Sequence, residues 1–120
     1  MPVMMLNLPF PPSVNGYWRT VRIGKSNRTM ISEKGRQYRT RVLESLGFAK
    51  STFTGRLRLT VEMYPPDRRK RDLDNFLKAS LDALTHAGIY QDDSQIDILI
   101  VKRMTVQKEG LLQVWIDEII

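Results

Sequence analysis

Residues 56 to 104 read as a strand, a helix and a second strand, and this order limits the possible folds more strongly than any other part of the chain. From Arg56 to Tyr64 apolar side chains occupy every second position, which predicts a half-buried strand. Apolar residues at helical spacing follow from Leu73 to Ala87, and Gly88 is suited to end that helix. Gln95 to Met104 is dense in Ile, Leu and Val, as a central strand would be. Two strands joined in this way are expected to run parallel, with a right-handed crossover.

The N-terminal part of the chain predicts another strand, a hairpin and a second helix. Val3 to Leu8 is apolar with one polar break, which predicts a first strand. Asn15-Gly16 is a turn signal, and the chain from Tyr17 to Ile31 predicts a hairpin with a polar, basic tip. Ser32 is a plausible N-cap for a helix that ends before Gly47.

The C-terminal part predicts a final strand. Lys108-Glu109-Gly110 predicts a turn, and Leu111 to Ile116 predicts the strand that follows it. We expect this strand to form an antiparallel hairpin with the preceding one at the edge of the sheet. Taken together, the elements predict an α/β (α+β) fold: one domain over residues 1–120, with a mixed β-sheet packed by two helices.

The charge of the chain indicates a polyanionic partner. It carries 19 Lys and Arg against 13 Asp and Glu, with a formal net charge of +6. Cysteine is absent, which excludes disulfides, thiolate metal sites and cysteine nucleophiles and agrees with a reducing cytoplasm. The first residues contain neither a basic segment nor an apolar run long enough for a signal or a membrane span. We therefore expect a cytoplasmic protein that binds nucleic acid and no membrane.

Two stretches are candidates for contact with nucleic acid. The first is a run of four consecutive cations: Arg68, Arg69, Lys70 and Arg71. Such a run stays ordered only in water or against a polyanion. The second is the hairpin, where Arg19 follows two aromatic residues, Tyr17 and Trp18, that could stack on a base or enter a base step. Alternatively, the two aromatic side chains simply pack on the core.

Asp72 and Asp74 follow the cationic run, where they would weaken a site built only to hold phosphate. Carboxylates beside a phosphate are useful when a divalent cation lies between them, and Mg²⁺ takes oxygen ligands of this kind. Asn75 adjoins the pair, and Lys78 lies one helical turn beyond Asp74, where it would neutralise the scissile phosphate or orient a water. Alternatively, Asp72 caps the helix, Asp74 favours its dipole and Lys78 pairs with Asp74. The pattern favours metal-dependent cleavage of a nucleic-acid backbone.

A metal site would use one of Asp92 and Asp93 as its third carboxylate, although both also suit a turn or a helix cap. Within one chain the distance is unfavourable, because a helix from Asp74 to Ala87 spans roughly 20 Å. The return to Asp93 would have to be almost straight. Two copies of the helix packed antiparallel about a two-fold axis would solve this problem. We therefore hypothesise a homodimer in which Asp72 and Asp74 of one chain share each metal site with Asp93 of the other.

Four segments together resemble the RusA family of Holliday-junction endonucleases, nearly from end to end. They are residues 8–15 (LPFPPSVN), 32–39 (SEKGRQYR), 66–78 (PDRRKRDLDNFLK) and 82–95 (DALTHAGIYQDDSQ). The combination is far more specific than any one segment. The main departures are at Phe10 and in the hairpin from Arg19 to Met30, and they bear on sequence preference around the cut rather than on the chemistry.

The resemblance implies a homodimeric, Mg²⁺-dependent enzyme, with Mn²⁺ able to substitute, that nicks opposed strands of a four-way DNA junction. It also implies that Asp72, Asp74 and Asp93 are the acidic catalytic residues and that Lys78 is the essential basic one. Two alternatives remain open from the residues alone. One is a non-catalytic DNA-binding dimer, and the other is a metal-dependent nuclease or phosphohydrolase that acts on another nucleic acid or on a nucleotide.

Overall fold

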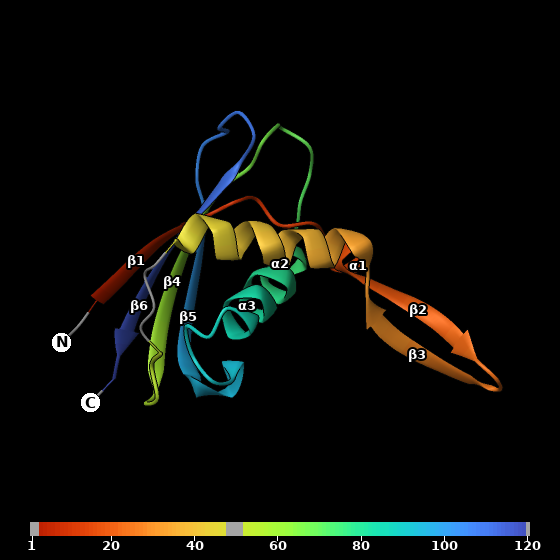
Figure 1. The fold of residues 1–120 in the computed structure, drawn as a ribbon. Coiled ribbons are helices and arrows are strands. Elements are labelled where there is room, and N and C mark those ends of the chain that lie inside the picture. The colour runs from red at the N-terminus through yellow and green to blue at the C-terminus, as the bar shows by residue number, and fades with distance from the viewer. Residues whose placement is uncertain (1–2, 48–51, 120) are drawn as a thin grey trace.

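The computed structural model describes residues 3–47 and 52–119, and its main sheet has four strands in the order β1-β6-β4-β5 (Figure 1). The bounds are Val3–Leu8 for β1, Leu57–Tyr64 for β4, Ile96–Arg103 for β5 and Leu111–Glu118 for β6. β4 runs parallel to β5, whereas β6 is antiparallel to both β1 and β4. The mixed sheet predicted from the sequence is confirmed.

β4 is the strand around which the core is built. Its residues alternate as predicted, and Leu57, Leu59, Val61 and Met63 are almost completely buried. The connection from β4 to β5 passes through helix α3 (Leu77–His86), which confirms the parallel crossover. Burial of these side chains on one face fixes the register of β4, because a shift by one residue would turn the whole apolar set toward solvent.

The position of the last two strands differs from the prediction. β5 is an edge strand rather than a central one, and β6 lies between β1 and β4 instead of forming a hairpin with β5. The loop after β5 makes this possible because it folds over the end of β4: the N–H of Met104 donates to the Met63 carbonyl at 2.8 Å, and that of Gln107 to the Pro65 carbonyl at 2.9 Å. The chain therefore crosses the end of β4, and β6 pairs with β4 on the side opposite β5.

Two helices cover one face of the sheet (Figure 1). Helix α2 (Glu33–Leu46) begins as predicted at Ser32, whose Oγ accepts a hydrogen bond from the Gly35 N–H at 3.0 Å, and it ends at Gly47. The second helix differs from the prediction in its first turn. Residues Leu73–Phe76 form a short 3-10 helix, η1, before α3 begins. Within the described ranges no helix is both long and apolar enough to cross a membrane.

A hairpin stands away from the main sheet, as Figure 1 shows. Its strands are β2 (Trp18–Ile23) and β3 (Ser26–Ile31), which confirms the predicted hairpin. The predicted turn at Asn15-Gly16 is instead a single helical turn, α1 (Val14–Tyr17), because the Ser13 Oγ accepts a hydrogen bond from the Gly16 N–H at 3.3 Å and so caps it. The hairpin begins directly at the end of this turn, which fixes the direction in which it leaves the core.

Candidate active site

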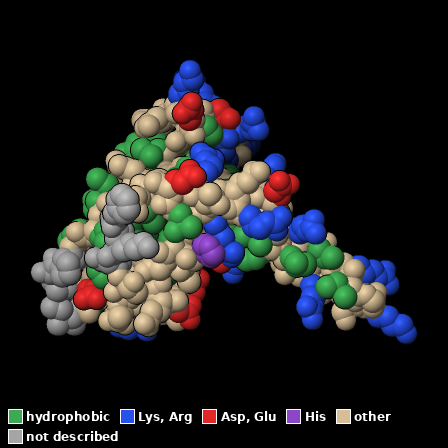
Figure 2. Space-filling view, viewed as in Figure 1, with side chains coloured by type: hydrophobic (Ala, Val, Ile, Leu, Met, Phe, Trp, Pro, Cys, Tyr) green, Lys and Arg blue, Asp and Glu red, His purple; other side chains and the backbone are tan. Residues whose placement is uncertain are grey.

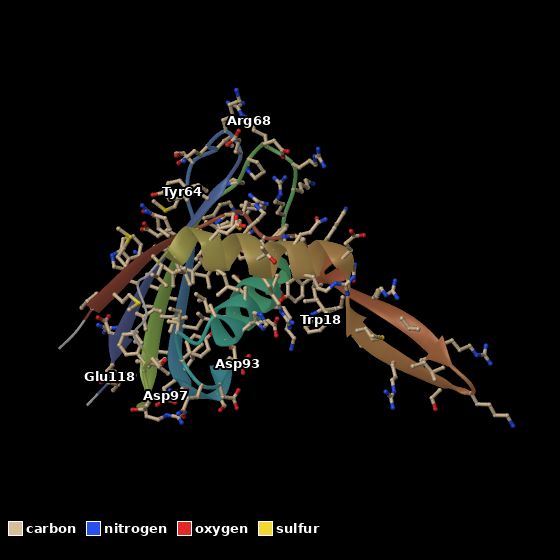
Figure 3. The ribbon with its side chains drawn as sticks, viewed as in Figure 1. Trp18, Tyr64, Arg68, Asp93, Asp97 and Glu118 are labelled. Carbon is tan, nitrogen blue, oxygen red and sulfur yellow. The ribbon has the colours of Figure 1, made fainter. Side chains whose placement is uncertain are left out.

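The loop between β4 and η1 carries the predicted cationic run, and Figure 3 shows Arg68 at its outermost point. Arg68, Arg69 and Lys70 are exposed to solvent. Arg71 differs, because only 11% of its side chain is exposed and its Nη1 lies 2.8 Å from Oδ1 of Asp67. Its guanidinium also lies over the Phe10 ring, 5.5 Å from the centroid. Arg71 therefore holds the loop in place, and the other three cations present charge to solvent.

Asp67 is the carboxylate that this loop uses for its own structure. Hydrogen bonds from Arg71 and from the Arg69 N–H lower the pKa of Asp67 to about 2. A carboxylate that is held in this way remains ionised at neutral pH and fixes the turn around it. The first acid of the motif is thus part of the scaffold rather than part of the candidate site.

Asp72 and Asp74 lie at the start of η1 and are both exposed. Asp72 occupies the N-cap position, but its side chain makes no capping hydrogen bond, and only its carbonyl accepts the Asn75 N–H, at 3.1 Å. The interpretation of Asp72 as a side-chain cap is therefore wrong. Among the residues described, neither carboxylate has a hydrogen-bond or ion-pair partner, so both are available to a ligand.

Asp92 and Asp93 have different surroundings. Asp92 caps the 3-10 helix η2 (Asp93–Gln95): its Oδ1 accepts from the Ser94 N–H at 3.3 Å, and Gln95 Oε1 accepts its N–H at 2.9 Å. Most of Asp93 is exposed, but partial burial of its carboxylate, together with the hydrogen bond and charge of Asp92, raises its pKa. The positive charge of the Lys78 ammonium opposes that rise in pKa.

A hollow of about 790 Å³ separates the base of the hairpin from the start of α3. Lys78 lines it from the helix, while Trp18 and Arg19 line it from the first strand of the hairpin. The remaining lining residues are Val14, Asn15, Thr20 and Thr29. Two cations and an indole around one hollow form a surface that suits a phosphate and an unstacked base.

The two aromatic residues at this place have different roles. Tyr17 is fully buried, so the prediction that it stacks on a base is wrong. Trp18 is half-buried and packs edge-to-face on Tyr17, with ring centroids 5.0 Å apart. The Trp18 indole N–H is buried and has no hydrogen-bond partner among the described residues. Trp18 is therefore the aromatic residue of this pair that faces the hollow.

The reason for the burial of Tyr17 is a charged cluster that sequence reasoning missed. Asp82 on α3 accepts hydrogen bonds from the Tyr17 hydroxyl and from Arg39 on α2, whose Nη2 lies 2.8 Å away. The cluster ties the hairpin base to both helices. No local spacing indicates this cluster, because Tyr17 and Arg39 lie 65 and 43 residues from Asp82 in the sequence. The Arg39 guanidinium is therefore held by Asp82.

One chain does not bring the predicted acids together. Among the residues that the structure describes, no three His, Cys, Asp or Glu side chains are close enough to hold a metal ion. Asp93 begins η2, which leads into β5, whereas Arg71, next to Asp72, accepts a hydrogen bond at its carbonyl from Arg103 at the other end of that strand, at 2.6 Å. Carboxylates suit Mg²⁺ as ligands, but the described residues of one chain do not bring the three predicted acids into one group.

Exposed Lys and Arg side chains gather over the hairpin and over the loop between β4 and η1. Figure 2 shows Lys and Arg side chains over the projecting hairpin and over the loops at the top of the molecule. On the hairpin the exposed cations are Arg19, Arg22, Lys25 and Arg28. A backbone that lay across both regions would pass the hollow and Lys78, which lie between them.

Comparison with known proteins identifies relatives that are named as endodeoxyribonucleases, which agrees with a surface for nucleic acid. The family model for endodeoxyribonuclease RusA matches residues 9–116. The chain is 43% identical over 114 residues to a crossover junction endodeoxyribonuclease rusA of Enterobacteria phage HK97, covering 93% of this chain and 92% of that protein. It is 41% identical to the crossover junction endodeoxyribonuclease RusA of Shigella sonnei and 39% identical to that of Escherichia coli K12, each over 120 residues, 94% of this chain and 92% of the relative. The chain belongs to the RusA family of endodeoxyribonucleases.

Proposed function

We propose that this chain, a crossover junction endodeoxyribonuclease by its homology, resolves four-way (Holliday) DNA junctions by Mg²⁺-dependent hydrolysis of phosphodiesters. The observation that supports the chemistry is the pair of exposed, unpartnered carboxylates, Asp72 and Asp74, directly beside an exposed cationic loop. If stability alone mattered, neighbouring carboxylates and cations would form ion pairs, as Asp67 and Arg71 do. Leaving them unpaired is useful when a cation and a phosphate complete the arrangement.

The metal would be held by Asp72, Asp74 and Asp93, with Mn²⁺ able to take the place of Mg²⁺. When bound, it would stabilise negative charge on the phosphoryl group and make a water more acidic. Lys78 offsets charge that builds on the phosphate in the transition state. A carboxylate has to be ionised to act as a metal ligand, so the raised pKa of Asp93 means that metal binding weakens as the pH falls.

The DNA would be held by residues around the site. Arg68, Arg69 and Lys70 contact the backbone from the loop, and the Asn75 side chain at the start of the helix can add a polar contact. In the hollow, Trp18 stacks on an unpaired base and Arg19 binds an adjacent phosphate. A junction offers unstacked bases at its crossing point, so such contacts favour it over a regular duplex.

The functional unit is a homodimer with two shared sites, each formed by Asp72 and Asp74 of one subunit and Asp93 of the partner subunit. The separation of these acids within one chain supports this arrangement. Two sites related by a two-fold axis match the symmetry of a four-way junction, and they would produce paired, symmetric nicks in opposed strands.

Co-expression of two differently tagged variants tests the chemistry and the sharing together. On a cruciform plasmid with Mg²⁺, the wild type linearises the DNA by paired nicks, and EDTA abolishes cutting. The Asp74→Asn and Asp93→Asn homodimers bind the junction without cutting it. Their heterodimer has one intact site, because the Asp74 and Asp93 that remain meet there, so it nicks without linearising.

The matched control is Asp92→Asn, because asparagine keeps the helix cap and removes a neighbouring carboxylate. This variant should still linearise the plasmid. An inactive heterodimer would contradict the shared site, and wild-type cutting by Asp74→Asn would contradict the metal site. Junction binding without any Mg²⁺-dependent nicking would indicate a non-catalytic DNA-binding dimer, and equal cutting of duplex, single strands or RNA would indicate a nuclease for another nucleic acid.

A further inference from the structure

Gln95 is a buried polar side chain that the proposed chemistry does not use. Apart from tyrosine, the polar side chains buried among the described residues are those of Ser80 and Gln95. The Ser80 hydroxyl donates to the Phe76 carbonyl one helical turn earlier, so its partner is local. Gln95 instead bonds to two other segments of the chain. A buried amide destabilises the fold unless its donors and its acceptor are paired, so its partners show what it does.

The Gln95 amide is fully hydrogen-bonded. Its Oε1 accepts the backbone N–H groups of Gln91 and Asp92, at 2.7 and 2.9 Å. Its Nε2 donates to the backbone carbonyls of Phe53 and Gly55, at 3.0 and 2.9 Å. Two donors and two accepted bonds are the full capacity of an amide side chain. The side chain thus fastens the loop before β5 to the segment before β4.

The loop that Gln95 fastens carries Asp93. Asp93 is the first residue of η2, which has only three residues. A helical segment this short has too few internal hydrogen bonds to hold a side chain in a fixed direction. The N–H of Asp92, immediately before Asp93, is one of the groups that Gln95 binds. The direction of the Asp93 carboxylate therefore depends on the Gln95 amide.

The segment on the other side of Gln95 is a firm support. Phe53 is buried, and its N–H donates to the Ile89 carbonyl at 2.8 Å. A few residues later the chain enters β4 at Leu57, which is completely buried. The loop is thus bound to this support at its start, through Ile89, and again at its end, through Gln95. The support connects the position of the loop to that of the core sheet.

We propose that Gln95 is a positioning residue for the acidic site: its amide fixes the turn that directs Asp93 and so raises the affinity for the divalent cation, without contact to metal or DNA. Gln95 has this role only if Asp93 is a metal ligand, as in the function proposed above. All the contacts lie within one chain, so the role does not depend on which subunit supplies the other acids. Groups that orient a metal ligand typically change metal affinity or activity by about 10–100-fold when they are replaced.

Gln95→Met tests this role, because methionine is similar in length and flexibility but has no N–H donor and only a weak acceptor. Mn²⁺ titration of the variant bound to a junction, followed by electron paramagnetic resonance, should give an affinity at least about tenfold below that of the wild type. Junction binding in EDTA should be unchanged. In the metal-free protein, amide exchange of residues 91–95 should be faster. If Gln95→Met does not fold, Gln95→Asn, whose amide is one methylene too short to reach both segments, is measured in the same way.

Tyr90→Phe is the matched control. It removes another hydrogen bond of the same loop, from the Tyr90 hydroxyl to the Leu81 carbonyl at 2.8 Å, on the side of α3. This variant should lose stability but keep the Mn²⁺ affinity of the wild type. Equal losses of affinity in Tyr90→Phe and Gln95→Met would indicate general loosening of the loop and would overturn the proposal.

Asp93→Asn separates the role of Gln95 from the function on which it rests. Asp93→Asn should lower the Mn²⁺ affinity, and adding Gln95→Met should lower it no further, because Gln95 acts through that carboxylate. Wild-type affinity in Asp93→Asn would refute both the proposed metal site and the role of Gln95. A lowered affinity in Asp93→Asn, with wild-type affinity in Gln95→Met or with additive losses in the double variant, would keep the metal site and reject Gln95 as its positioning residue.

Discussion

The charged cluster of Tyr17, Arg39 and Asp82 makes a quantitative prediction. Replacing Arg39 by Gln removes two hydrogen bonds to Asp82, from Nε at 3.0 Å and Nη2 at 2.8 Å, and leaves the carboxylate with the Tyr17 hydroxyl. The side chains of Arg39 and Asp82 are only 23% and 27% exposed, so water replaces the lost partner incompletely.

The expected loss of stability lies between two limits. Breaking a fully buried ion pair costs about 3–5 kcal/mol, and breaking an exposed one costs about 0–1 kcal/mol. For a pair buried by about three quarters we expect a loss of about 2 kcal/mol in the free energy of unfolding. With a urea m-value of about 2 kcal/mol per molar for a chain of this size, the unfolding midpoint should fall by about 1 M.

Urea unfolding followed by tryptophan fluorescence measures this shift, and Arg56→Gln is the matched control. Arg56 makes the same kind of pair with Asp97, but its side chain is 55% exposed. The control should move the midpoint much less than Arg39→Gln does. Arg39→Gln should also speed amide exchange in β2 and β3, because the cluster fixes the hairpin base to the helices. Equal midpoint shifts in the two variants would refute the view that this cluster holds the hairpin in place.

Three further predictions test other parts of the molecule. Trp18→Ala should weaken junction binding by about 1–3 kcal/mol in gel shifts with EDTA, because one base stack is lost, while Trp18→Phe should retain most of it. Gly35→Ala should destabilise the protein by about 1–3 kcal/mol in urea, because a Cβ there would lie 2.6 Å from the Tyr17 carbonyl oxygen, whereas Gly16→Ala, with 3.5 Å to its nearest atom, should not. The lowered pKa of Asp67 stabilises the folded protein above the unfolded-state pKa of about 3.9, and this stability is lost as the pH falls toward about 2. Over that pH range the urea midpoint should therefore drop less in Asp67→Asn than in the wild type.

The local elements could be predicted from the sequence because their causes are local. The alternation in β4, the Ser32 cap of α2 and the turn of the hairpin each depend on neighbouring residues, and the structure contains all three. The order of the strands could not be predicted in the same way. β5 has more consecutive apolar residues than β6, yet β6 is central, because the loop over the end of β4 carries the chain past its neighbour. The amino-acid composition of the strands does not predict the route of this loop.

The sequence predicts which types of residue form the candidate site, but it predicts the role of each residue less well. Asp72, Asp74 and Asp93 are exposed, as a site requires, and the capping role of Asp92 agrees with the choice of Asp93 as the third acid. Arg71 and Tyr17 were misjudged for different reasons. The Tyr17 hydroxyl is held by Asp82, 65 residues away, and sequence spacing does not reveal such a tertiary partner. Arg71 pairs with Asp67 only four residues away, but this contact depends on the conformation of the loop.

The distribution of paired and unpaired acids separates scaffold from site. Asp67 and Asp82 each bind an arginine, and Asp92 caps a helix, so these three carboxylates stabilise the fold through partners within the chain. Asp72 lies as close in sequence to the cationic run as Asp67 does, and Asp74 lies two residues further on, but among the described residues that run pairs with neither. If stability alone had shaped this segment, the nearest arginines would pair with the nearest acids. In the function proposed above, a divalent cation carrying a phosphate would complete the charge balance of this surface.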